Sequence, residues 1–207
     1  TQNSPDISQS MLARAADFGI SLVPSQAPGI HCRPFVEMSM ICALPQSHRL
    51  AGLPAIDLAK LDGEPMIALG RDDQSHRVII EALSHAGAQV ETRAEVAMAD
   101  TACVLVSQGF GFAVVPAMTP MSWSSGGIAF VPIHPPPRMT LWLYTSAWEP
   151  TSQLTQGLID RVQQGLLQAS PLFHSPPPRR SAASRPRRSR PPPRSTAHPR
   201  PACPHRE

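Results

Sequence analysis

Strand-like runs alternate with helical stripes through roughly the first 170 residues, and this alternation limits the possible folds more than any other feature of the sequence. We expect strands at residues 18–23, 36–44, 66–69, 89–96, 112–115, 128–133 and 139–145. We expect helical segments at residues 11–16, 56–61, 73–86, 101–108 and 152–168. Elements that alternate at such short intervals predict an α/β architecture with mixed or largely parallel sheets.

Two of the expected helices carry an apolar stripe at helical spacing. In the helix at 73–86, the stripe consists of Val78, Ile79, Ala82, Leu83 and Ala86. In the helix at 152–168, it consists of Leu154, Leu158, Ile159, Val162 and Leu166. Asp72 or Asp73 can cap the first of these helices, and Gly87 can end it. We therefore expect both helices to pack one face against a sheet.

Two glycines follow the helix expected at 101–108. Asp100 can cap this helix, Gly109 can end it in a left-handed conformation, and Gly111 lets the backbone bend into the next strand, which Pro116 stops. A dinucleotide-binding fingerprint also contains closely spaced glycines, but there they come between a strand and the following helix. The order here is the reverse, so we expect no such cofactor.

The composition changes sharply near the end of the chain. The 34 residues from His174 to Glu207 hold ten prolines and nine arginines, and they contain no Val, Ile, Leu, Met, Phe, Trp or Tyr. A segment without large apolar side chains cannot offset the entropy lost on ordering. We therefore expect a disordered tail, with the domain boundary placed at 170/171. The tail is either a tether for anionic surfaces or an extension without a selected function.

Net charge divides along the same boundary. The tail carries nine arginines against Glu207, whereas the rest of the chain carries nine Lys and Arg against fourteen Asp and Glu. The basic balance of the whole chain, +3, thus comes from the tail. A charge argument for nucleic-acid binding by the folded part fails.

Several other classes of function are disfavoured by the spacing of reactive residues. The four cysteines form no C-x-x-C pair, and the adjacent His31 and Cys32 cannot point the same way on a strand, so we expect reduced thiols and no metal site. No G-x-S-x-G motif is present, and we expect no enzymatic activity. The longest apolar stretch, residues 101–118, is interrupted by polar residues and glycines, so we expect no membrane span.

Four segments, in order, resemble the effector-binding domain of LysR-type bacterial transcription regulators. They are ADFGI at 16–20, LPQSHRLA at 44–51, IDLAKLDGEPMI at 56–67 and VLVSQGFGFAVVP at 104–116. Each is a weak signal alone, and their order and spacing together are more specific. The resemblance covers roughly residues 11–167. Arg49 stands where the family usually has proline.

The resemblance implies a two-lobed fold like that of periplasmic solute-binding proteins. Lobe one would comprise residues 1–43 and 143–170, and lobe two residues 44–142. The lobes would be joined by crossover strands near 40–44 and 141–145. The family's helix-turn-helix, its linker helix and the first elements of lobe one have no counterpart in this sequence, so lobe one and its dimerisation surface are expected to be incomplete. DNA would be bound only through the missing helix-turn-helix.

A small effector would bind between the lobes. We expect its contacts at two places in lobe two that precede helices: Leu69, Gly70 and Arg71, and then Met98, Ala99 and Thr101. Backbone N–H groups at a helix start suit a carboxylate or phosphate, and Arg71 would add a charged donor. The negative charge of Asp100 disfavours the binding of an anion at this place, and neighbouring alanines favour a more apolar effector. The alternative interpretation of Arg71 is a solvated loop residue, so both effector classes stay open.

We therefore expect the sensory domain of a cytoplasmic LysR-type regulator, without cofactor, metal or membrane partner. Effector binding would control the oligomeric state of the DNA-bound protein, a homo-oligomer at full length. Two alternatives stay open at this point. One is the solute receptor of a transporter, which shares the two-lobed fold, and the other is a truncated fragment without function.

Overall fold

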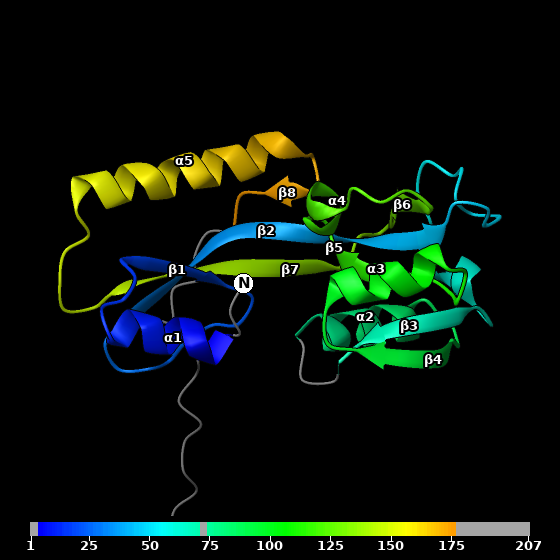
Figure 1. Cartoon of the computed structure of the whole chain (residues 1–207), viewed down its shortest axis with the longest axis horizontal. Helices are drawn as coiled ribbons and strands as arrows, with labels where there is room; N and C mark the ends of the chain where they lie inside the picture. The colour runs from blue at the N-terminus through cyan, green and yellow to red at the C-terminus, as the bar shows by residue number, and fades with distance from the viewer. Residues whose placement is uncertain (1–3, 71–73, 177–207) are drawn as a thin grey trace, which may run out of the picture. The chain divides into compact units, whose positions relative to one another are not determined.

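The computed structural model describes residues 4–70 and 74–176, whose course is shown in Figure 1. The chain divides into one compact unit, Thr1–Pro176, and a second unit, Pro177–Glu207, that lies outside the described residues. The first unit thus continues past the boundary expected at Ser170. Apart from residues 174–176, the predicted tail lies outside the described part of the chain.

Helices and strands alternate along the described chain, which confirms the predicted α/β class. The strands are β1 (Phe18–Ser21), β2 (Ile30–Pro45), β3 (Pro65–Leu69), β4 (Glu91–Val96), β5 (Ala113–Pro116), β6 (Ile128–Pro132), β7 (Arg138–Ser146) and β8 (Phe173–His174). The helices are α1 (Ser4–Leu12), α2 (Gln74–His85), α3 (Ala99–Ser107), α4 (Thr119–Ser122) and α5 (Gln153–Ala169), with a 3₁₀ turn η1 (Leu58–Leu61). Each predicted strand has a counterpart, whereas β8 was not predicted.

The long strand β2 is shared by two groups of strands. Its residues 30–39 pair antiparallel with β7, which pairs in turn with β1, and β8 lies against residues 37 and 38. Its residues 40–45 pair antiparallel with β5 and β6. We call the first set, with α1 and α5, the β7 group, and the second set the β5–β6 group. The crossover was expected at residues 141–145, but these residues pair with β2 as part of β7. The chain passes from the β5–β6 group to the β7 group just before Arg138.

The strand β2 begins six residues earlier than predicted, at Ile30 rather than at residue 36. Pro34 and the bulge between Pro34 and Val36 interrupt the simple alternation of side chains, so the sequence pattern shows only the second half of the strand. That second half is almost completely buried, and its burial explains the continuous apolar run.

The strands β3 and β4 form a separate parallel pair, joined by the helix α2. Residues on the predicted stripe of α2 pack inward: Ile79 and Leu83 are 4% and 2% exposed. Gly87 follows the helix with φ of +70°, as predicted for a helix-ending glycine. The proposed caps Asp72 and Asp73 lie outside the described residues.

The predicted stripe of α5 is wrong in its first two turns. Ile159 is fully buried, but Leu154 and Leu158 are 87% and 53% exposed. Ser152 caps the start of the helix by accepting a hydrogen bond from the Thr155 N–H at 3.1 Å. Helical spacing identifies a face but not how far along the helix that face is covered, and no described element covers these two leucines.

Gly111 lies where two backbone segments meet closely. Its φ is +152°, and a Cβ at this position would collide with the Pro65 carbonyl. Beside it, Phe112 donates to that same carbonyl at 2.9 Å and accepts from Ile67 N–H at 2.7 Å. A glycine is therefore required for β3 to approach the start of β5. This close approach explains the glycine better than the backbone bend that was predicted from the sequence.

Side chains of two separate sequence segments meet at Glu64. Arg49 donates to Glu64 Oε1 from Nε at 3.2 Å and from Nη2 at 2.8 Å, and His48 Nε2 lies 3.5 Å from Oε2. Burial alone raises the pKa of the Glu64 carboxyl, but the hydrogen bonds and charges of Arg49 and His48 outweigh burial and hold the pKa below its usual value. These contacts tie the loop after β2 to the start of β3.

We expect Gly111→Ala to lower the free energy of unfolding by about 2 kcal/mol or more, because the side chain meets the backbone of Pro65. Urea denaturation provides the measurement. Gly157→Ala is the control, since Gly157 lies within α5 with open space around its Cα, and it should stabilise the chain by about 0.5–1 kcal/mol. Equal effects of the two variants would contradict this account of Gly111.

We expect Glu64→Gln to destabilise the chain by about 1 kcal/mol at pH 7, an estimate reduced because Arg49 is largely exposed. A carboxyl whose pKa is lowered by folding stabilises the protein above its unfolded pKa of about 4.3, and this contribution is lost as the pH falls through the folded pKa. The gap between variant and parent should therefore close below about pH 4. Urea titrations at several pH values, with the exposed Glu91→Gln as control, test this; a gap that persists in acid refutes it.

Candidate functional site

The carboxyl ends of β3 and β4 lie side by side. Leu69 pairs with Val96 in the parallel register, and Gly70 N–H donates to the Val96 carbonyl at 2.9 Å. Each strand is followed by a helix, α2 after β3 and α3 after β4. The structure thus brings the two predicted contact segments, which are far apart in the sequence, to one sheet edge.

The predicted contact residues differ in what they offer at this edge. Leu69 is 3% exposed, so it contributes main chain and not its side chain. Gly70 and Ala99 are half-buried, whereas Met98 is 53% exposed and Thr101 is exposed in the first turn of α3. Arg71 lies outside the described residues. The described part of the edge is therefore mostly main chain, with one hydroxyl and one thioether.

The capping role predicted for Asp100 is wrong. The N-cap of α3 is Met98, with an extended backbone, and among the described residues no side chain caps this helix. Asp100 instead lies in the first turn, where its negative charge favours the positive end of the helix dipole. The helix begins two residues earlier than predicted. Free N–H groups at this start are available to water or to an acceptor on a ligand.

His76, not selected from the sequence, holds the end of β3. Its Nδ1 lies 2.8 Å from the Leu69 carbonyl oxygen, so it donates this hydrogen bond. In the neutral ring, Nε2 is then an acceptor. A first-turn side chain leans back toward the start of its helix, and this rule could have pointed to His76. Beneath it, the space between β3 and α2 is closely packed.

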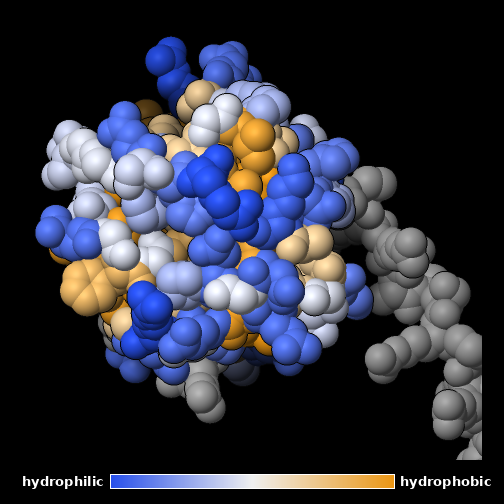
Figure 2. Space-filling model, turned by 90° about the vertical axis from the view of Figure 1, so that its right-hand side faces the viewer, coloured by the Kyte–Doolittle hydropathy of each residue, from blue (hydrophilic) through white to orange (hydrophobic). Residues whose placement is uncertain are grey.

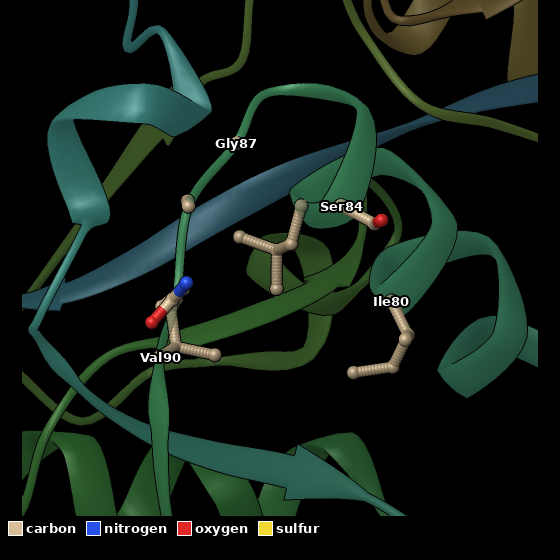
Figure 3. Close-up of a pocket in the computed structure, with 7 residues that line it drawn as sticks. Ile80, Ser84, Gly87 and Val90 are labelled. Carbon is tan, nitrogen blue, oxygen red and sulfur yellow. The ribbon is translucent and has the colours of Figure 1, made fainter.

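Two hollows of the described part of the chain lie away from the predicted contact residues. One, of about 350 Å³, lies at the end of α2, where Ile80 and Val90 point toward each other across it (Figure 3). It is lined by Ile80, Leu83, Ser84, Gly87, Ala88, Gln89 and Val90. Another, of about 340 Å³, lies beside the end of α1 and the start of α5, where Arg14 and Glu149 form an ion pair at 2.8 Å. The face shown in Figure 2 is mainly polar, with separate apolar spots.

The reactive side chains of the described residues offer no metal site. No three His, Cys, Asp or Glu residues are clustered there to hold a metal ion. Among the described cysteines, Cys32, Cys42 and Cys103, no disulfide forms. Burial raises the pKa of Cys42, and burial followed by the charge of Asp100 raises the pKa of Cys103 to about 11, so both stay protonated at neutral pH. None of the described helices is both long and apolar enough to span a bilayer.

Comparison with known proteins gives one family. The model of the LysR substrate binding domain matches residues 1–167. The regulatory protein NocR of Agrobacterium tumefaciens (strain T37) is 29% identical over 138 residues, covering 59% of this chain and 46% of NocR. This chain spans about half the length of the curated relatives it matches.

Solved structures with the same fold include effector-bound domains. The regulatory domain of Synechocystis PCC6803 CcmR in complex with 2-PG aligns with a TM-score of 0.63 at 19% identity, covering 79% of each chain. The BenM effector binding domain with its effector benzoate aligns with a TM-score of 0.66 at 17% identity, covering 85% of this chain and 80% of BenM. At this identity the likeness establishes the fold, which is the predicted periplasmic-binding-protein-like fold.

We expect His76→Ala to lower the free energy of unfolding by about 1 kcal/mol, because the Leu69 carbonyl loses its hydrogen-bond donor. Amide exchange at Gly70 should accelerate as the end of β3 loosens. His85→Ala is the control, since His85 is exposed at the other end of the same helix. Urea denaturation and exchange measured by NMR at pH 8 test this, and unchanged exchange at Gly70 would show that His76 does not hold this edge.

Proposed function

The chain belongs to the LysR substrate-binding domain family, and we propose that it binds a small effector at the shared carboxyl edge of β3 and β4. Members of this family are parts of transcription regulators rather than enzymes, so we propose no reaction for it. A regulator of bacterial genes acts on DNA, and we propose the cytoplasm as its location.

One observation carries this proposal: two helices begin at the same end of a parallel strand pair. In open α/β sheets, ligands bind in the crevice beyond the carboxyl ends of the strands. The N-termini of α2 and α3 each carry a partial positive charge, and at the start of α3 no side chain of the described residues caps the N–H groups. We propose Leu69, Gly70, Met98, Ala99 and Thr101 as contacts, with Arg71 proposed from the sequence alone.

For the effector we propose an organic anion. The helix starts and Arg71 favour negative charge, and in the solved neighbours BenM is bound to benzoate. Asp100 weighs against this choice, since its carboxylate lies in the first turn of α3. The exposed flanking residue Ala97 favours an effector with an apolar body, and an aromatic carboxylate combines such a body with a negative charge.

We further propose that the effector acts by drawing two lobes together. The lobes are those expected from the sequence, residues 1–43 with 143–170 and residues 44–142, and we propose that the chain passes between them at Ser39–Met40 and just before Arg138. Closure about the strands that join them would change the oligomeric state of a DNA-bound homo-oligomer. DNA binding itself is proposed for another part of a longer protein, because the curated relatives are about twice as long as the matched segment.

Binding of matched pairs of compounds tests the effector class. We would titrate the 207-residue chain with benzoate and benzamide, and with glycerol phosphate and glycerol, by calorimetry and thermal unfolding. We expect an anion to raise the melting temperature while its neutral partner does not. A neutral compound that binds as tightly as its anionic partner would refute the proposal that the effector is an anion. If none of a wider set of carboxylates and phosphates binds, the proposed binding site is refuted.

We expect Thr101→Val to weaken binding of a confirmed anion about tenfold, because one hydrogen-bond donor at the start of α3 is lost. Thr92→Val is the matched control, since Thr92 is exposed on β4 and pairs with Met66 near the opposite end of the strand pair. Equal losses in both variants would place the ligand elsewhere.

A further inference from the structure

Hydrogen bonds around Ser39 mark the point where β2 passes between its two strand groups. Ser39 N–H donates to the Leu172 carbonyl at 2.9 Å, on the side of the β7 group. The Ser39 carbonyl accepts from Ala117 N–H at 3.1 Å, next to β5, and Met40 N–H donates to the Pro137 carbonyl at 2.8 Å. Peptide units are rigid planes, so the planes before and after the Ser39 Cα are held by different partners and are joined by two rotatable angles.

The partner on the β7 side comes from the end of the compact unit. After α5, the chain turns at Ser170, whose Oγ accepts from Leu172 N–H at 3.3 Å and whose carbonyl accepts from Phe173 N–H at 3.2 Å. This turn returns the chain to β2, where β8 lies between α5 and β2 (Figure 1). The family model ends at residue 167, so this segment lies beyond the matched part.

Two side chains fix the returning segment to β2. Phe173 is 4% exposed and lies opposite Met38, which is fully buried. On the other face, His174 Nε2 lies 3.4 Å from Ser39 Oγ, and Ser39 is 1% exposed. Gln163 of α5 donates to the Phe35 carbonyl at 2.6 Å, so the helix that leads into the segment is itself attached to the same strand.

We propose that residues 170–174 are a strap that restricts rotation at Ser39, and that the docked strap sets how freely the β7 group and the β5–β6 group move relative to each other. With the strap docked, the peptide plane before Ser39 is held and rotation there must break its hydrogen bond to Leu172. With the strap released, that plane loses this bond and is held only by the pairing of β2 with β7. The inference does not depend on the proposed effector site, since every contact it uses lies at the strand junction.

Release of the strap by Phe173→Ala tests the proposal in the full chain. We expect amide exchange at Ser39 to accelerate about tenfold relative to Val114, whose strand pairs with the other half of β2. Leu166→Ala is the control, because Leu166 packs on the core from α5 without contributing to the strap. His174→Ala, a milder change, should accelerate Ser39 exchange about threefold and serves if Phe173→Ala fails to fold.

Distances between spin labels test the consequence for motion. Labels at Gln164→Cys on α5 and Glu81→Cys on α2, with Cys32→Ser and Cys203→Ser in the background, report on the two parts of the chain. We expect a distance distribution about twice as broad in either strap variant, and the parental width in Leu166→Ala. Unchanged exchange at Ser39, or faster exchange with an unchanged distance distribution, would overturn the proposal.

Discussion

Pairing of the single strand β2 on both of its edges is the interaction on which the rest of the structure depends. A buried strand must satisfy its N–H and C=O groups, and β2 does so with β7 and β8 along one half and with β5 and β6 along the other. From Phe35 to Leu44, its side chains supply much of the core. The two strand groups therefore share both backbone hydrogen bonds and buried apolar area through one segment.

The candidate site is linked to β2 indirectly, through β5. Most of the groups that the site offers belong to the main chain. The β3–β4 pair is attached to β5 through Phe112 and the close approach at Gly111. At the far edge of that pair, Gly70 and Ala99 expose backbone, and Thr101 adds a hydroxyl. Such a surface offers main-chain hydrogen-bond donors at a helix start, which agrees with the proposed effector.

Much of the fold could be predicted from local patterns, because those patterns arise from local physics. Gly87 and Gly109 end their helices with positive φ, and the strands around residues 66–69 and 128–133 follow from short apolar runs. The failures occur where tertiary structure decides. The first turns of α5 have a helical stripe at Leu154 and Leu158 without a covering element, and Met98 rather than Asp100 begins α3. Parallel pairing of neighbouring strands could have predicted that the two contact segments lie together, and only the first-turn position of His76 pointed to its hydrogen bond with Leu69.

The position of Ser39 within β2 has a mechanical consequence. Nine residues separate it from Ile30, and at about 3.3 Å per residue this half of the strand is a lever roughly 30 Å long. A rotation of about 10° at the pivot would displace the far end by about 5 Å, enough to change which surfaces meet there. A change in one backbone dihedral angle at Ser39 can thus produce a movement the size of a side chain at the far end of the strand.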